Sequence, residues 1–217
     1  HVTALAGVPT TLLDLDAALL ETALAKIEIN LDKGVKRGKL TAEEKAGALE
    51  RLSISTDHDV LADAELMIEA IPEKMELKKD LFCAADKRMP DNAIMASNTS
   101  SLSITEIASA TQRPESVIGM HFFNPAHRMA LVEVITSPTT DEACLADAVA
   151  LCRRLGKEPV IVRDTPGFVT SRLGLLLGNE AMRIVEEGVA SAADVDTAMR
   201  LGYNHPMGPL ELADLVG

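Results

Sequence analysis

Short apolar runs alternate with helical patterns through the middle of this sequence. Residues 65–71, 93–98 and 117–122 have the apolar composition of buried strands, while residues 74–88 and 103–110 between them have the composition and spacing of helices. Parallel strands need a crossover connection, usually a helix. This order therefore predicts an α/β domain built around a doubly wound, mainly parallel sheet.

The order changes after residue 122. Only the short polar link 124–129 separates that run from the apolar run 131–135, and a link this short cannot carry a crossover helix. These two strands are therefore predicted to pair as an antiparallel hairpin. A helix over about 141–155 and a strand over 159–162 complete the domain.

From Pro166 onward the pattern is helical only, and Ser191 with Asp194 indicates a helix N-cap. We expect a domain boundary near Arg163–Pro166. The sequence then divides into an α/β domain over residues 1–165 and an all-α domain over residues 166–217.

The predicted hairpin brings a histidine opposite an acid. If its turn is centred on His127, then His121 lies directly across from Glu133, with Cβ atoms about 4.5–5.5 Å apart. This pair suits a dehydrogenase, because an imidazole accepts the proton that leaves an oxidised alcohol, and the carboxylate fixes the tautomer and stabilises the imidazolium. Asn124 is placed to orient a substrate or the ring. A lone histidine at a strand end is more often structural, and both interpretations stay open on this ground alone.

An earlier β-type run, residues 10–14, ends in Asp14. In dinucleotide-binding folds an acid at the end of the second strand holds the ribose 2′-hydroxyl, and a carboxylate there favours NAD over NADP. The glycine-rich phosphate loop lies roughly 20 residues before that acid. We therefore expect this loop and the first strand to precede His1. Asp14 alone also fits an ordinary turn residue.

Polar residues follow two predicted strands at the edge where a doubly wound sheet binds ligands. Glu73 and Lys78 are within reach of a ribose or nicotinamide, but they also fit surface charges that open a helix. Asn98 and Ser100 belong to a row of four small polar residues at a strand-to-helix turn. They are predicted to hydrogen-bond cofactor and substrate, although an N-capped turn has the same composition.

Charge and composition restrict the partners. The formal net charge of -12 argues against a general affinity for nucleic acid or anionic membranes. No apolar run approaches the roughly 20 residues that span a bilayer. The three cysteines form no CxxC pair, which predicts reduced thiols in a cytosol-like compartment. No metal site is predicted.

Four segments, in order, closely resemble the L-3-hydroxyacyl-CoA dehydrogenases, including the short-chain 3-hydroxybutyryl-CoA dehydrogenases. They are ASNTSSL (96–102), GMHFFNPAHRMALVEV (119–134), DTPGF (164–168) and HPMGPLELADLVG (205–217). The resemblance implies a Rossmann-type NAD-binding domain followed by a helical domain that forms a homodimer. It also implies an enzyme that oxidises an L-3-hydroxyacyl-CoA with NAD, or runs the reverse reduction. The cysteine pattern leads us to expect that this enzyme is cytoplasmic.

The resemblance further implies roles for single residues. The family's catalytic and substrate-contacting positions are occupied by His121 as the base, Glu133 as its partner, Ser100 and Asn124. Its cofactor-contacting positions are occupied by Asp14, Glu73, Lys78 and, on the nicotinamide side, Ser100. The positions that bind coenzyme A are occupied by Asn30 and Arg37, in and after a helix whose basic end can meet phosphates.

Some features depart from the family pattern. The glycine-rich turn is not in the sequence, Ser171 stands where the family commonly has asparagine, and the sequence stops at Gly217 within the helical domain. Other functions stay open: a dehydrogenase of hydroxy or sugar acids without CoA, a non-catalytic structural relative, and a segment of a longer multifunctional β-oxidation protein.

Overall fold

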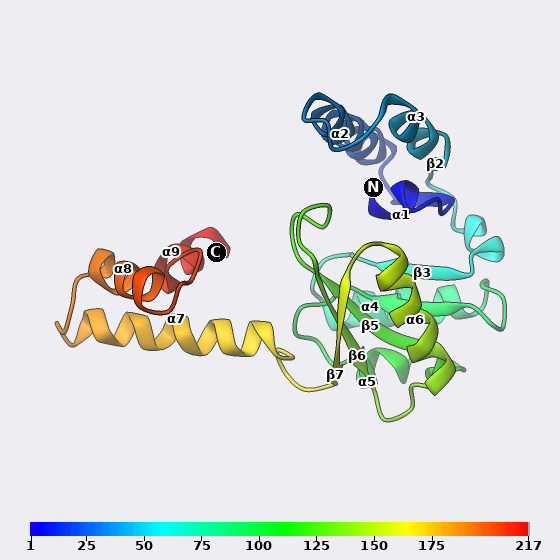
Figure 1. Ribbon diagram of the computed structural model, residues 1–217. Coiled ribbons are helices and arrows are strands. Elements are labelled where there is room, and N and C mark those ends of the chain that lie inside the picture. The colour runs from blue at the N-terminus through cyan, green and yellow to red at the C-terminus, as the bar shows by residue number, and fades with distance from the viewer. Residues whose placement is uncertain (217) are drawn as a thin grey trace. The chain divides into compact units, whose positions relative to one another are not determined.

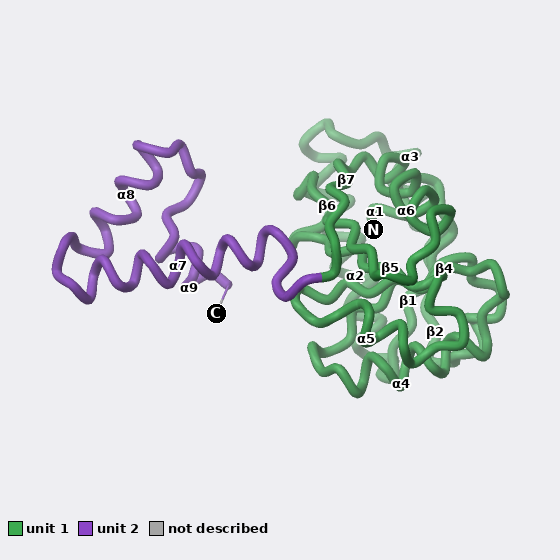
Figure 2. The backbone as a smooth tube through the Cα atoms, turned by 90° about the horizontal axis from the view of Figure 1, so that it is seen from below, with its two compact units in different colours: residues 1–164 green, residues 165–217 purple. Residues whose placement is uncertain are grey.

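The structure is a computed structural model that describes residues 1–216. Its chain divides into two compact units, the first comprising residues 1–164 and the second beginning at Thr165 (Figure 2). The first unit contains all the strands, and the second is helical.

The first unit is built around a five-stranded sheet with strand order β3-β4-β5-β6-β7. The strands are β3 (Leu66–Glu69), β4 (Ile94–Ser97), β5 (Val117–Phe122), β6 (Leu131–Thr136) and β7 (Glu158–Arg163). All neighbours are parallel except β5 and β6, which pair antiparallel. The predicted mainly parallel sheet with one hairpin is confirmed.

Helices cover both faces of this sheet (Figure 1). On one face, Ile118, Met120, Val132 and Val134 pack in a buried cluster with the inner side of α6 (Glu142–Arg154). The other face carries α4 (Met75–Asp86) and α5 (Ile104–Ala108). Because side chains alternate along a strand, the odd-numbered residues of β5 and β6, including His121 and Glu133, point to this second face.

Gly119 is needed on that second face. A Cβ at this position would lie 2.8 Å from the Cβ of Ile135 and 3.0 Å from the Cδ1 of Ile104, closer than packed carbon atoms approach. The glycine therefore lets α5 pack closely against β5, two residues before His121.

The amino-terminal part of the first unit forms a separate parallel pair of strands, β1 (Thr10–Leu13) and β2 (Leu52–Ser55). Three helices, α1 (Val2–Leu5), α2 (Ala17–Lys36) and α3 (Ala42–Glu50), accompany this pair around a small core of Ala4, Leu31 and Ala48. Two short 3-10 segments, η1 (His58–Asp63) and η2 (Pro114–Ser116), lead into β3 and β5.

Local sequence signals explain where these helices begin and end. Asp16 caps α2, its carboxylate accepting from the Ala18 amide at 2.8 Å. The helix ends before Gly38, which adopts a left-handed φ of 65°. Thr41 and Glu44 form a capping box at the start of α3. β2 and α1 were not predicted, because each is only 4 residues long and β2 is partly exposed.

The second unit contains α7 (Thr170–Glu186), α8 (Ala192–Gly202) and α9 (Pro209–Val216). Ser191 caps α8 by accepting from the Asp194 amide, as predicted. Asp196 of α8 accepts from the Leu210 and Glu211 amides and so fixes the start of α9. Within residues 1–216, no helix has both the length and the apolar composition to cross a membrane.

Candidate active site

The hairpin places His121 directly opposite Glu133 in the register of β5 and β6. The His121 Nδ1 and the Glu133 Oε2 lie 2.8 Å apart, and both side chains are buried. The pairing predicted from the length of the hairpin link is therefore confirmed as geometry. A hydrogen bond from Nδ1 to a carboxylate fixes the tautomer of a neutral imidazole, which then has its lone pair on Nε2. The ring of Phe123 contacts the imidazole, with ring centroids 4.6 Å apart.

Asn98 joins the ends of three strands. Its backbone amide donates to the Glu69 carbonyl at 2.8 Å, and its side-chain Oδ1 accepts from the Phe122 amide at 2.8 Å. The strand that carries His121 therefore orients the side-chain carbonyl of Asn98. The NH₂ group is the part of Asn98 that can donate to a ligand.

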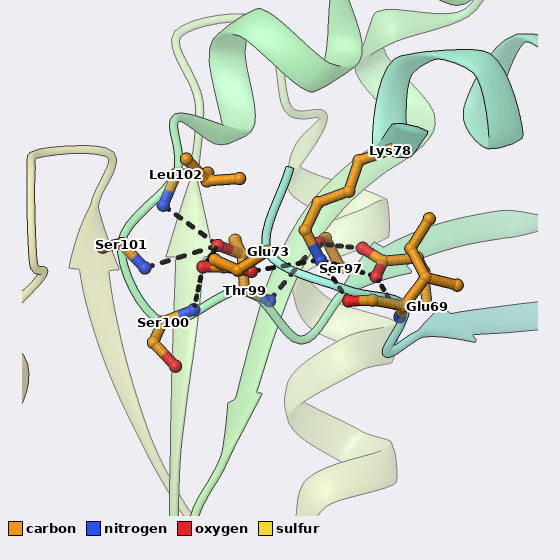
Figure 3. Close-up of polar contacts among 9 residues, drawn as sticks. Glu69, Glu73, Lys78, Ser97, Thr99, Ser100, Ser101 and Leu102 are labelled. Atoms are coloured by element: carbon orange, nitrogen blue, oxygen red, sulfur yellow. Dashed lines mark hydrogen bonds and ion pairs between the residues drawn. The ribbon is translucent and has the colours of Figure 1, made fainter. Parts of the chain in front are cut away.

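Ser100 lies on the turn after β4 and is held through its backbone. Its amide donates to the Glu73 Oε1 at 3.0 Å, and the same oxygen accepts from the Thr99 hydroxyl (Figure 3). The Thr99 Oγ1 also accepts from the Leu102 amide at 2.9 Å, which closes the turn. In Figure 3 the Ser100 hydroxyl points away from these contacts, as a ligand-binding group would.

Glu73 is kept charged by its surroundings. Partial burial alone would raise the pKa of this carboxyl, but hydrogen bonds from Thr99, Lys78 and the Ser100 amide outweigh it and lower the pKa below its ordinary value. Glu73 thus brings a carboxylate, 41% exposed, to the strand ends.

Lys78 is buried, so the alternative that it is an exposed charge at the start of a helix is wrong. Its side chain is only 1% exposed, and its ammonium lies between the carboxylates of Glu69 and Glu73, at 2.6 and 3.2 Å. Sequence reasoning missed Glu69 altogether, because one acid within an apolar run gives no sign of a partner nine residues later on a helix.

Asp14 directly follows β1, and its carboxylate is exposed. Its Oδ1 accepts from the Asp16 amide at 3.1 Å, which orients the carboxylate at the start of α2. Asn30 and Arg37 belong to the far end of the same helix. Asn30 is half-buried on α2, and Arg37 is its exposed C-terminal cap, following Lys33 and Lys36 in the last turn. The structure therefore confirms the expected basic helix end.

Asn124 lies on the exposed loop between β5 and β6. This loop is held by Lys157, whose buried ammonium donates to the carbonyls of Ala126 at 2.5 Å and Met129 at 2.7 Å. Sequence reasoning missed this contact, because Lys157 follows a helix 28 residues beyond Met129.

Asp164, the last residue of the first unit, anchors α5. Its Oδ2 accepts from the Ser103 hydroxyl at 2.8 Å and from the amide and hydroxyl of Thr105 at 2.8 and 2.6 Å. Partial burial would raise the pKa of Asp164, but these hydrogen bonds lower it below its ordinary value. Ser171 is half-buried in the first turn of α7 in the second unit.

The remaining titratable groups give no sign of a metal centre. In the part of the chain that the structure describes, no three histidine, cysteine or acidic side chains gather as ligands. Cys144 and Cys152 lie in the core against β5 and β6, where burial raises the pKa of each thiol to about 11. These two cysteines are structural.

The fold and the polar residues at the strand ends define a class of protein. A mainly parallel sheet with helices on both faces and polar turns at its strand ends, together with an acid directly after β1 of the separate parallel pair, is typical of the nicotinamide-dependent dehydrogenases. Residues 1–165 match the family model for the NAD binding domain of 3-hydroxyacyl-CoA dehydrogenase, and residues 167–217 match that for its C-terminal domain.

Individual relatives agree with these matches. The chain is 47% identical over 198 residues to the 3-hydroxybutyryl-CoA dehydrogenase of Clostridioides difficile, covering 91% of this chain and 70% of that protein. It is 44% identical over 224 residues to the mitochondrial hydroxyacyl-coenzyme A dehydrogenase of Mus musculus, covering 100% and 71%. The crystal structure of the (S)-3-hydroxybutyryl-CoA dehydrogenase of Ralstonia eutropha is similar with a TM-score of 0.97 and 42% identity, covering 100% of this chain and 76% of that one. The chain belongs to the 3-hydroxyacyl-CoA dehydrogenase family of oxidoreductases, and its first domain is the family's NAD-binding domain.

Proposed function

We propose that the chain catalyses the reversible oxidation of an L-3-hydroxyacyl-CoA to the 3-oxoacyl-CoA. When bound, NAD would supply the acceptor for the hydride that leaves carbon 3 of the substrate. The relatives are named for hydroxybutyryl, hydroxyadipyl and general hydroxyacyl groups, and the feature that these names share is the hydroxyacyl-CoA.

The buried pair of His121 and Glu133 carries this proposal. The hydroxyl proton must leave together with the hydride, and His121 takes it on Nε2 while Nδ1 faces the carboxylate at 2.8 Å. Glu133 then stabilises the imidazolium. In the reverse direction the same imidazolium returns the proton to the carbonyl oxygen.

Residues around the pair are assigned to the substrate and the cofactor. Ser100 and Asn124 orient the substrate's oxygen functions, and the NH₂ of Asn98 donates a hydrogen bond toward the cofactor side. Ser100 belongs to both sets, since its hydroxyl points outward from a turn that its backbone fixes.

The residues present also fit NAD. The exposed carboxylate of Asp14 beside a helix N-terminus suits a ribose 2′-hydroxyl and would repel the 2′-phosphate of NADP. Glu73, supported by Lys78, offers a second carboxylate at the ends of β3 and β4. The basic end of α2, with Asn30 and Arg37, suits the phosphates of CoA.

Replacing His121 tests the proposed chemistry. In the complete natural protein, His121→Gln is expected to reduce kcat by about 10²–10⁴-fold, the contribution of a general base, and to leave NADH affinity unchanged. His58→Gln, in the 3-10 segment η1, is the control and should retain activity. Near-normal turnover of acetoacetyl-CoA by His121→Gln would contradict the assignment.

Substrate comparison separates the alternatives. If free hydroxy acids are oxidised faster than hydroxyacyl-CoA thioesters, the chain is a hydroxy- or sugar-acid dehydrogenase. If no 3-oxoacyl-CoA supports NADH oxidation, a non-catalytic role is favoured.

We further propose that the helical second unit mediates a homodimer. The exposed apolar side chains of this unit support the proposal, with Leu175 on α7 and Leu215 on α9 being 67% and 69% exposed. A dimeric mass in light scattering, converted to a monomeric one by Leu175→Glu, would agree with it. A wild-type monomer at micromolar concentration would contradict it.

A further inference from the structure

A buried carboxylate lies beneath the polar turn of the site and has no part in the proposed chemistry. Glu69 ends β3, and its side chain is 0% exposed. Its Oε2 accepts from the Ser97 hydroxyl at 2.6 Å, while its Oε1 accepts from the Lys78 ammonium at 2.6 Å and the Ile71 amide at 2.7 Å (Figure 3). Burying a charged carboxylate is costly, and these three donors offset that cost.

The carboxylate of Glu69 lies on the same face of the sheet as the catalytic pair. In the strand registers Glu69 pairs with Ser97, and Ser97 pairs with Gly119, two residues before His121. Partners in register share a face and alternate residues return to it. The buried carboxylate therefore belongs to the layer from which the site is built.

The Lys78 ammonium forms ion pairs with two carboxylates. It donates to Glu69 at 2.6 Å and to the Ile71 carbonyl at 3.3 Å, and it forms an ion pair with Glu73 at 3.2 Å. Glu69 is the nearer partner by 0.6 Å, from 3.2 Å less 2.6 Å. Because Coulomb attraction weakens with distance, the Lys78 ammonium interacts more strongly with Glu69 than with Glu73.

Glu73 consequently keeps acceptor capacity for a ligand. Its Oε1 accepts from Thr99 and the Ser100 amide, whereas its Oε2 faces the ammonium at the longer distance. A carboxylate oxygen has two lone-pair sites, and this side chain is 41% exposed. A hydroxyl donor, such as that of a ribose, is the group that this oxygen suits.

We infer that Glu69 is a positioning residue for the cofactor. By holding Lys78 it leaves Glu73 only partly engaged and able to accept from a ribose hydroxyl of NAD, and the Ser97 hydroxyl holds the Glu69 carboxylate in place for this role. This inference rests on the proposed contact of NAD with Glu73, and it adds the buried group on which that contact depends.

Glu69→Gln in the complete natural protein tests it. The amide keeps the shape and can accept from Lys78 and donate to a rotated Ser97 hydroxyl, so mainly the charge is lost. Lys78 then turns to Glu73 as its sole carboxylate. We expect the Kd for NADH to rise about ten-fold, the cost of one hydrogen bond to a charged group, with kcat for acetoacetyl-CoA within about three-fold of wild type.

A double-variant cycle separates positioning from simple support of the fold. If Glu69 acts through Glu73, Glu69→Gln should weaken NADH binding by no more than about two-fold once Glu73→Gln is present. Asp86→Asn is the matched control, because Asp86 is another buried carboxylate, at the opposite end of α4, paired with Arg113 at 2.7 Å. It should lower the melting temperature and leave the Kd for NADH unchanged.

The outcomes are distinct. A Kd for NADH within about two-fold of wild type in Glu69→Gln, or fully additive effects of the two glutamate changes, overturns the inference. Should Glu69→Gln fail to fold, Ser97→Ala is the second variant, because it removes the hydroxyl that donates to Glu69. It is expected to raise the Kd for NADH about three-fold, and an unchanged Kd would also overturn the inference. NADH binding is measured without acyl substrate, so the effect of Glu69→Gln on the Kd can be interpreted even if the protein does not catalyse the proposed reaction.

Discussion

The most informative single change in the catalytic pair is Glu133→Gln, because it removes a charge and little else. The carboxylate and the imidazole are buried and lie 2.8 Å apart between Oε2 and Nδ1. The side-chain amide of glutamine has nearly the same shape, and its oxygen can still accept from Nδ1. The change therefore isolates the stabilisation that a carboxylate gives to the imidazolium formed during turnover.

The size of the effect follows from the geometry. Since the carboxylate charge is spread over two oxygens, the centres of charge are about 4 Å apart, and two unit charges at that distance attract by about 4 kcal/mol at an effective permittivity of about 20. The glutamine oxygen, as a neutral dipole, retains part of this. A loss of about 2–4 kcal/mol remains, which corresponds to about 30- to 1000-fold in kcat.

The assay is the oxidation of NADH by acetoacetyl-CoA, with kcat and KM measured together and NADH binding measured by titration. Glu133→Gln should lower kcat and leave NADH affinity and thermal stability near the wild-type values. Glu158→Gln, an exposed acid on the neighbouring strand β7, serves as the matched control. A kcat within about three-fold of wild type would show that the carboxylate only orients the ring, and the electrostatic reasoning would be refuted.

Three further changes test the surroundings of the pair. Lys157→Met removes the ammonium that holds the loop after β5, and it should raise the KM for acetoacetyl-CoA and lower the free energy of unfolding by about 1–3 kcal/mol in denaturant titration. Asp164→Asn should cost about 1–2 kcal/mol at pH 7. Because the folded-state pKa of Asp164 is lowered, this stabilisation is present above the unfolded carboxyl's pKa near 4 and is lost as pH falls through the folded value, so melting curves of variant and wild type should converge in acid. Gly119→Ala should cost about 1–3 kcal/mol through its clash with Ile135, and an unchanged melting temperature would contradict the close packing of α5.

The sheet was predictable from the sequence because its signals are local. Apolar runs between helical segments predicted five strands, and a link too short for a helix predicted which pair is antiparallel. Side chains alternate between the two faces of a strand, so the length of the hairpin link determined which residue lies opposite His121. The opposition of His121 and Glu133 in register confirms that reasoning.

The supports of the site were not predictable in the same way. Glu69 and Lys78 meet only when a strand end and the first turn of a helix pack together, and Lys157 reaches carbonyls 28 and 31 residues earlier in the chain. Such pairs depend on tertiary packing, and neither the residue types nor their spacing in the sequence predicts them. The strand β2 was missed for another reason, since four half-exposed residues carry too little periodicity to stand out.

The antiparallel pairing of β5 and β6 also limits how this enzyme can change during evolution. The loop of residues 124–129 is largely exposed, so its composition is free to change. The register of the two strands is not free, because a slip of one residue in the pairing would send Glu133 to the opposite face and bring Val132 or Val134 before the imidazole. Insertions there must be absorbed as a bulge or a longer loop outside the paired strands. Substitutions within the loop are therefore expected to be tolerated more readily than changes in the length of the paired strands.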